Sequence, residues 1–180
     1  KSFIVRQNKS RLVDLTVFAL LGVIMFVSKY LTEAIPNVHF IGMLTMTYTI
    51  VYRKKALVPI YVFVFLIGIF NGFNMWWIPY LYIWTVLWAV TMLLPKKMSK
   101  KVAIPVYAVV CALHGLCYGT LYAPAQALMF GLDFKGMLTW IAAGFYFDII
   151  HAIGNFALGF LIIPLSEALQ KFHKSAKKEN

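Results

Sequence analysis

Charged residues are scarce in this sequence, and acidic ones are the scarcest. Asp, Glu, Lys and Arg together make up 13% of the 180 residues, and only six of these are acidic. About a quarter of the residues in a soluble domain are charged, so the composition excludes a typical soluble protein. No nucleotide-binding loop is present, and we therefore do not expect the chain to hydrolyse ATP.

Cysteine is also scarce. Cys111 and Cys117 are the two cysteines, and they lie six residues apart in one apolar run. This spacing puts them on roughly opposite faces of a helix, so we expect neither a disulfide nor a metal-binding pair. The sequence also lacks a G-x-S-x-G motif and an arranged nucleophile. We predict that the chain is not an enzyme and that it needs no cofactor and no metal.

Most of the sequence consists of long apolar runs. Hydrophobic residues make up 62% of the chain, in six runs separated by charged or Pro- and Gly-containing breaks. A hydrocarbon core about 30 Å thick is crossed by about 20 helical residues. We therefore predict a single all-α domain over residues 1–180, an integral membrane bundle of six transmembrane helices. Its spans are expected near residues 12–31, 38–52, 56–73, 77–94, 102–122 and 137–165.

The basic residues predict the orientation of this bundle. The formal net charge is +11, yet 15 of the 17 Lys and Arg residues fall in the four segments 1–11, 53–55, 96–101 and 171–178. By the positive-inside rule, both termini and both basic loops are cytoplasmic in a multi-pass protein of the cell membrane. This clustering argues against a nucleic-acid partner. We interpret the basic tail as a solvated flank, with contact to anionic membrane lipids as the alternative.

Three connections fall on the other side of the predicted membrane. They are residues 32–40, 71–76 and 122–136, and they combine turn-forming Pro, Gly and Asn with many apolar side chains. We expect such apolar loops to fold onto the bundle as a lid. Lys29 and Glu33 are four residues apart at the start of this region, and we expect them to pair with each other.

The segment "GFYFDIIHAIGNF" places polar residues inside an apolar run. Gly144, Asp148, His151, Asn155 and Gly159 follow a helical spacing and predict one buried stripe. Ionisable groups in the bilayer interior cost roughly 2.5–3.5 kcal/mol on insertion scales, so they usually face the bundle interior and mark function. His114 falls at a similar depth in the preceding run, and counting residues from the two membrane surfaces suggests that it contacts Asp148.

Aromatic residues form a second stripe. Trp77, Tyr80, Trp84 and Trp88 share one helical face, and Trp84 is too deep to belong to an interfacial belt. An aromatic wall opposite a carboxylate and two imidazoles would suit a flat ring with hydrogen-bonding groups. Two alternatives stay open. The polar residues could simply hold helices together, or His114, Asp148 and His151 could bind a metal ion.

Several segments together resemble a known transporter family. The segments "PNVHFIGM", "VYRKKAL", "WWIPYLYIWTVLW", "LHGLCYGTLYAPAQALMFGL" and "FDIIHAIGNF" are similar to the substrate-binding S component of energy-coupling factor (ECF) transporters, ABC-type importers of vitamins. The likeness extends from about residue 10 to residue 170. Chain length, six spans, a basic cytoplasmic fringe and an apolar lid agree with it.

The resemblance implies a function and partners. An S component captures a vitamin or related micronutrient with high affinity and docks on a transmembrane coupling (T) component that carries two ABC-type ATPases. Pyridoxine or hydroxymethylpyrimidine is our first expectation for the cargo, with cobalamin or another vitamin as alternatives. A structural or assembly membrane protein and a metal-ion permease are the competing functions.

The resemblance also implies site residues. The family binds its ligand in the outer half of the bundle, between the later helices and the loop after the first. It docks through small residues on the first helix, in an A-x-x-x-A pattern that Thr16, Ala19 and Gly22 match only with a spacing of three. The expected ligand-binding residues are Asn37, His39, Trp77, Tyr80, Trp84, His114, Tyr118, Asp148, His151 and Asn155.

Overall fold

The computed structural model describes residues 2–35 and 37–178. Within these residues the chain forms eight α-helices and two short 3-10 helices, and no strand. The elements are α1 (Ser2–Leu31), α2 (Ile41–Tyr52), η1 (Arg53–Ala56), α3 (Leu57–Asn71), η2 (Met75–Trp77), α4 (Tyr80–Leu93), α5 (Lys100–Leu116), α6 (Tyr118–Phe130), α7 (Phe134–Gly159) and α8 (Ile162–Lys178).

Five helical segments of the described chain are long and apolar enough to cross a membrane. They are Arg11–Leu31, Ile41–Asn71, Met75–Leu93, Lys100–Phe130 and Phe134–Gly159. The all-α prediction is confirmed, and these segments fit a membrane protein. Six spans would require α2 and α3 to cross separately, although at 12 and 15 residues they are only about 18 and 22 Å long, shorter than a hydrocarbon core. The six-span topology and the cytoplasmic termini stay predictions.

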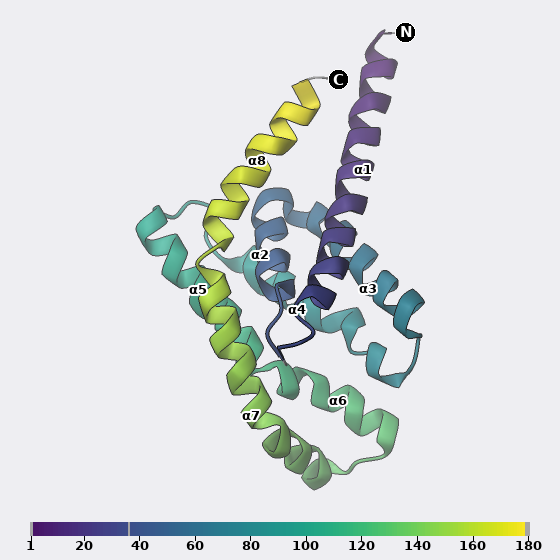
Figure 1. The fold of residues 1–180 in the computed structure, drawn as a ribbon, viewed down its shortest axis with the longest axis vertical. Coiled ribbons are helices and arrows are strands. Elements are labelled where there is room, and N and C mark those ends of the chain that lie inside the picture. Colours follow the sequence, from purple (N-terminus) through teal and green to yellow (C-terminus); the bar gives the residue numbers. More distant parts are fainter. Residues whose placement is uncertain (1, 36, 179–180) are drawn as a thin grey trace.

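The chain reverses direction between α2 and α3. In Figure 1, α2 runs toward the end that holds both termini, and α3 runs away from it after η1. Arg53 takes a positive φ of 54° at this bend, which is uncommon for a residue with a side chain. Two hydrogen bonds hold the bend to α4: Arg53 Nη2 donates to the Met92 carbonyl oxygen (2.9 Å), and Trp88 Nε1 donates to the Arg53 carbonyl oxygen (3.0 Å).

Residues 118–130 are helical, so the prediction of a loop over 122–136 is wrong for most of its length. The predicted fifth span ends early, because α5 stops at Leu116 and α6 leaves in a new direction after Cys117 (Figure 1). Cys117 is exposed at this break, whereas Cys111 is buried within α5. Gly131 ends α6 in the left-handed conformation, and the Asp133 side chain caps α7 by accepting from the Gly136 N–H (2.7 Å).

The helices α5 and α7 pack closely through small residues. A Cβ atom added at Gly159 would lie 2.5 Å from the Ala108 Cα, and one at Gly115 would lie 3.0 Å from the His151 carbonyl oxygen. Small residues let helix backbones approach in this way in membranes. The predicted stripe is confirmed for Asp148, His151, Asn155 and Gly159, which are the buried residues of α7, whereas Gly144 is only half-buried. The close approach of α5 therefore fixes the position of the polar residues on α7.

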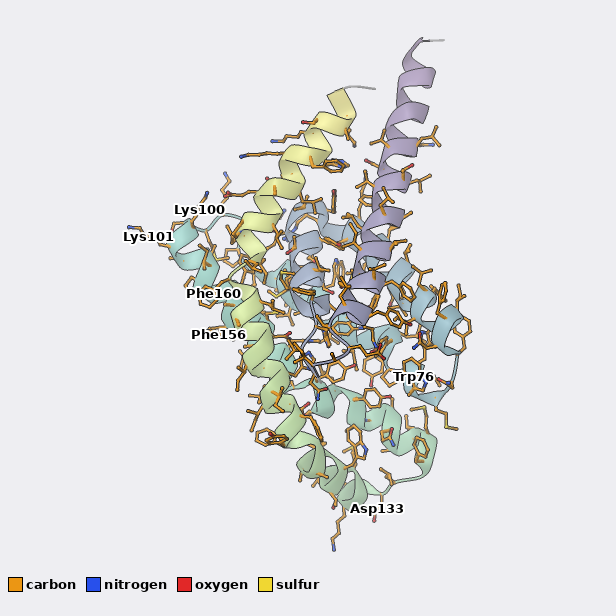
Figure 2. All side chains as sticks on the ribbon, viewed as in Figure 1. Trp76, Lys100, Lys101, Asp133, Phe156 and Phe160 are labelled. Carbon is orange, nitrogen blue, oxygen red and sulfur yellow. The ribbon has the colours of Figure 1, made fainter. Side chains whose placement is uncertain are left out.

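Basic segments gather at the end of the molecule that holds both termini. Lys100 and Lys101 project on that side, and Asp133 lies at the opposite end (Figure 2). Ion pairs tie the segments together there: Lys100 pairs with Glu167 (2.7 Å), and Lys55 and Lys177 both pair with Asp14 (3.1 and 2.8 Å). This clustering agrees with the charge asymmetry on which the topology prediction rests.

Candidate functional site

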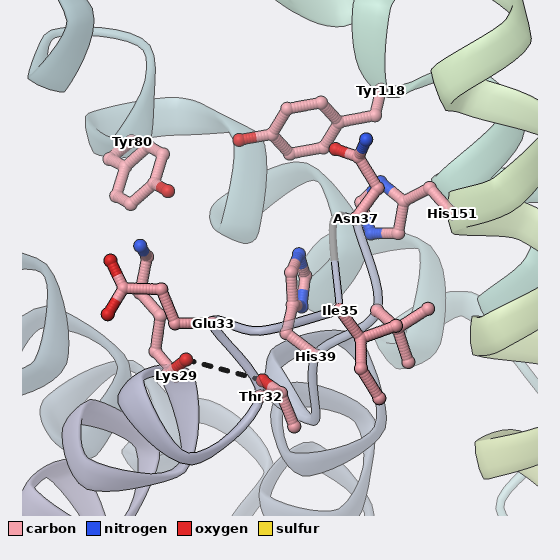
Figure 3. Close-up of a pocket in the computed structure, with 10 residues that line it drawn as sticks. Lys29, Thr32, Glu33, Ile35, Asn37, His39, Tyr80, Tyr118 and His151 are labelled. Atoms are coloured by element: carbon pink, nitrogen blue, oxygen red, sulfur yellow. Dashed lines mark hydrogen bonds between the residues drawn. The ribbon is translucent and has the colours of Figure 1, made fainter.

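A cavity of about 220 Å³ lies beyond the C-terminal end of α1, on the side away from the termini, and next to the second half of α7. The last turns of α1, the 32–40 connection, α4, α6 and α7 all contribute to its wall (Figure 3). We call it the ring cavity, because imidazole and phenol rings make up much of its wall. Half of the ten predicted ligand-binding residues line it: Asn37, His39, Tyr80, Tyr118 and His151.

The rings of the ring cavity contact one another and the aromatic residues behind them. The ring centroids of His39 and His151 are 4.6 Å apart, and those of Tyr118 and His151 are 5.0 Å apart. Trp84 lies behind this layer, with its ring centroid 5.8 Å from His39 and 5.7 Å from His114. Tyr118 extends across the cavity toward Tyr80 in Figure 3. The predicted aromatic wall therefore contains Tyr80 and Trp84, with imidazole rings beside it.

Buried polar atoms without a hydrogen-bond partner surround this part of the bundle. Within the described residues they include five atoms from the predicted set: His39 Nδ1, Trp84 Nε1, His114 Nδ1, His151 Nε2 and Asp148 Oδ2. Most buried polar atoms in native proteins have a partner, because an unpaired one loses its hydration without compensation. His39 and His151 line the ring cavity, so a molecule in that cavity could reach their free nitrogens. Trp84 and His114 lie behind the wall, and Asp148 lines a different cavity.

One cation and one anion also line the ring cavity. Lys29 and Glu33 belong to its wall, but no ion pair joins them, so the predicted pairing is wrong. Thr32 Oγ1 donates to the carbonyl oxygens of Ser28 (3.2 Å) and Lys29 (3.3 Å), which extends the end of α1 toward the cavity. The two charged side chains remain available to a ligand.

A second cavity of about 410 Å³ lies between α6 and α7 and shares Asn37 and Tyr118 with the ring cavity. We call it the side cavity. The rings of Tyr122 and Trp140 stack at its wall, 5.6 Å apart and 18° from parallel. Asp148 lines the side cavity, where its Oδ1 accepts a hydrogen bond from the Gly119 N–H (3.0 Å). The predicted carboxylate therefore faces a neighbouring compartment instead of the imidazoles.

The predicted contact between His114 and Asp148 is absent. His114 Nε2 lies 3.1 Å from the Ile83 carbonyl oxygen, and Asp148 bonds to Gly119. The break at Cys117 explains the error: it puts Gly119 opposite Asp148 while His114 stays on the other side of the break. The prediction estimated the depth of His114 by counting residues along one straight fifth helix, without a break at Cys117.

Two other predicted residues serve packing. Trp77 lies in η2, not in α4, and its Nε1 donates to the Val64 carbonyl oxygen (2.8 Å) in the core. Asn155 Nδ2 donates to the Cys111 carbonyl oxygen (3.0 Å) and so connects α7 to α5. Neither residue lines the ring cavity or the side cavity.

The predicted docking residues of α1 differ in their exposure. Thr16 and Ala19 are exposed, whereas Gly22 is buried. A Cβ atom at Gly22 would lie 2.4 Å from a Val62 side-chain carbon, so Gly22 supports the packing of α1 on α3. The exposed part of the predicted motif is therefore limited to Thr16 and Ala19.

Sequence reasoning missed several cavity residues. Lys29, Thr32, Glu33, Ile35 and Val38 line the ring cavity from the end of α1 and the connection after it. No periodicity orders side chains in such a connection, although its apolar composition did predict that it folds onto the bundle. Trp140 was missed because nothing in the sequence indicated that α6 lies beside α7.

Among residues 2–35 and 37–178, no group of three or more His, Cys, Asp or Glu side chains is arranged to hold a metal ion. No protein-family model, curated protein or solved structure matches the chain.

Proposed function

We propose that this chain is the membrane-embedded substrate-binding subunit of an ECF-type ABC importer for a vitamin or related micronutrient. The observation that carries the proposal is the pair of unpartnered nitrogens on His39 and His151, two residues that line the ring cavity. The unpartnered nitrogens of Trp84 and His114 belong to the rings behind this wall. A ligand in the ring cavity would supply hydrogen bonds to His39 and His151. The sequence resemblance to S components supplies the transport context.

The chemistry of the wall favours a small heteroaromatic ring. Imidazole nitrogens, two tyrosine hydroxyls and the Asn37 amide both donate and accept hydrogen bonds, which matches ring nitrogens and hydroxyl groups. Aromatic faces add stacking. A volume of about 220 Å³ accommodates pyridoxine or hydroxymethylpyrimidine better than cobalamin, whose corrin ring is far larger. We therefore propose a pyridoxine-like or hydroxymethylpyrimidine-like cargo.

Transport in this proposal depends on partners. A T component and two ABC-type ATPases would supply the energy, and the exposed α1 face that carries Thr16 and Ala19 is the proposed docking surface. In this proposal both termini lie in the cytoplasm, so the ring cavity would lie toward the outside of the cell, where a scarce nutrient is captured.

Mass spectrometry of the purified protein tests this function. The protein is prepared from cells grown in rich medium and denatured, and released small molecules are identified. We expect one vitamin-like molecule in near-stoichiometric amount, and co-purification of two ATPases with a T component from the native membrane. A protein that releases no small molecule, binds neither pyridoxine nor hydroxymethylpyrimidine and brings down no ATPase would contradict the proposal.

A structural role is the second candidate. The hydrogen bonds from Asn155 to Cys111 and from Gly119 to Asp148 join helices, as they would in a protein whose buried polar groups only hold the bundle together. Such bonds contribute about 0.6 kcal/mol on average in a membrane protein. This role leaves the His39, His114 and His151 nitrogens unexplained. A metal-ion permease gains no support from the side-chain geometry, and elemental analysis of the purified protein tests it directly.

A further inference from the structure

A third cavity, of about 350 Å³, lies at the end of the molecule that holds the termini. It is formed where α1, the α2–η1 bend and α8 meet. The residues that define its chemistry are Asp14, Tyr52, Lys55, His173, Lys174 and Lys177. We call it the basic cavity. It shares no residue with the ring cavity or the side cavity.

The basic cavity has more positive charge than its one carboxylate neutralises. Asp14 pairs with Lys177 (2.8 Å) and with Lys55 (3.1 Å), and its Oδ1 is 3.4 Å from His173 Nε2. Lys174 lines the same cavity and forms no ion pair with a carboxylate among the described residues. Three lysines therefore face a single acid, and the excess charge attracts an anion.

Two polar atoms of the basic cavity also lack a partner. The Tyr52 hydroxyl and His173 Nδ1 are buried without a hydrogen bond in the described structure, and their rings are in edge contact with centroids 5.2 Å apart. In the tautomer that carries its proton on Nδ1, a neutral His173 would donate to an incoming oxygen. A hydroxyl, an imidazole N–H and an ammonium group around one cavity are donors for an oxyanion with several acceptor oxygens.

We propose that the basic cavity binds a phosphate-bearing anion, with Lys174, Tyr52 and His173 as its donors. An apolar groove lined by Leu12, Thr16, Leu20 and Phe172 runs along the same two helices, α1 and α8. A phosphodiester headgroup with acyl chains would use both features, so the groove favours an anionic phospholipid over a free phosphate. Basic pockets between helices on the cytoplasmic side are known lipid-headgroup sites. The proposal is independent of the cargo of the ring cavity.

Native mass spectrometry of the full-length protein in detergent tests the site. The protein is incubated with phosphatidylglycerol or with phosphatidylcholine, and the lipid that remains bound is counted. We expect phosphatidylglycerol to be retained preferentially, and Lys174→Gln and Tyr52→Phe each to reduce that retention about fivefold. Lys171→Gln is the matched control, because Lys171 is exposed on the same helix and does not line the basic cavity. It should retain phosphatidylglycerol like the unchanged protein.

A thermal unfolding experiment separates the two phosphate sources. Inorganic phosphate is compared with chloride at equal ionic strength for the unchanged protein and for Lys174→Gln. Retention of phosphatidylglycerol without stabilisation by inorganic phosphate assigns the site to a lipid, and stabilisation that Lys174→Gln abolishes assigns it to a free anion. Equal retention of both lipids, together with no specific effect of inorganic phosphate, would overturn the proposal. An equal loss of phosphatidylglycerol binding in Lys171→Gln and Lys174→Gln would also overturn it.

Discussion

The ring cavity and the basic cavity satisfy their polar groups in different ways. In the ring cavity, His39 and His151 present nitrogens that no protein group reaches, and Lys29 and Glu33 line the wall without pairing. In the basic cavity, Asp14 on α1 contacts Lys55 from η1 and both Lys177 and His173 from α8. In the ring cavity these polar groups have no partner among the described residues. In the basic cavity the contacts of Asp14 join α1, η1 and α8.

This difference predicts how each region responds to mutation. Removing a polar group that has no partner breaks no hydrogen bond within the folded protein, but it removes a hydrogen bond that a ligand would form. Removing a group that joins two helices weakens the fold and leaves a partner unpaired. Stability and affinity should therefore separate when residues from the two kinds of region are changed.

The largest effect is expected on ligand affinity from His151→Ala. This change should weaken binding of the cargo by about 10- to 100-fold, because a buried hydrogen-bonding nitrogen is lost from the ring cavity. The unfolding temperature should fall somewhat, because His151 is 2% exposed and its ring packs against His39 and Tyr118. No polar partner is left unpaired, however, since His151 Nε2 bonds to nothing in the described structure. Isothermal titration with the ligand that the protein releases, or with pyridoxine, measures the affinity. His173→Ala, a histidine at the opposite end, is the control and should bind the ligand normally. A large loss of stability with unchanged affinity would favour the structural role.

Asn155→Ala should reduce stability and leave ligand affinity nearly unchanged. Asn155 is 1% exposed and donates to the Cys111 carbonyl oxygen, so the change removes a bond between α7 and α5 and leaves a small void. We expect a loss of about 1–3 kcal/mol in unfolding free energy, with ligand affinity nearly unchanged. Thermal unfolding in detergent measures the first quantity and titration the second. If affinity fell as much as in His151→Ala, Asn155 would belong to the binding site.

Asp14→Asn should loosen α8 with a smaller cost. The change removes the carboxylate that Lys55 and Lys177 share, and leaves the basic cavity with a larger excess of positive charge. Lys55 is largely and Lys177 partly exposed to solvent, so we expect a loss of about 1 kcal/mol or less. Hydrogen exchange should become faster in α8 and stay unchanged in α5. Added salt should reduce the difference between the two proteins, since it screens the same charges.

The smallest effect concerns pH. Burial, and then the neighbouring Lys177, lower the pKa of His173 below its ordinary value, while Asp14 acts in the opposite direction. Between that lowered pKa and the ordinary value of about 6.5 the unfolded chain binds the proton more readily, so stability falls as the pH is lowered through this window. The unfolding temperature of His173→Gln should depend less on pH there, in a phosphate-free buffer. Identical pH profiles for the two proteins would contradict this origin.

The polar stripe of α7 illustrates what the sequence predicts and what it leaves open. The spacing of Asp148, His151 and Asn155 correctly predicts one buried helix face. It does not predict that the three residues have different surroundings. At about 1.5 Å of rise per residue they are spread over roughly 10 Å, enough to pass from the side cavity to the ring cavity and then to the contact with α5. The surroundings of each residue depend on which neighbouring helix lies at its level. Periodicity along one helix does not contain that information.

Breaks in the helices account for most of the remaining differences. No proline or charged residue directly precedes the change of direction at Cys117, and Pro105 lies about three turns earlier in α5. The apolar run continues to residue 130, so hydropathy does not indicate the break. The contact of Asp148 with Gly119 depends on that break. Lys29 and Glu33 were visible in the sequence, but their separation from each other and their place in the cavity wall depend on how the 32–40 connection folds.

The two cysteines have a practical consequence for spectroscopy. Cys111 is buried in α5, whereas Cys117 is exposed at the break before α6, two residues from the glycine that holds Asp148. A membrane-permeant maleimide dye should therefore label the unmodified protein at a single thiol beside the side cavity. Fluorescence from that dye would report movements of α6 relative to α7 without the introduction of a foreign residue.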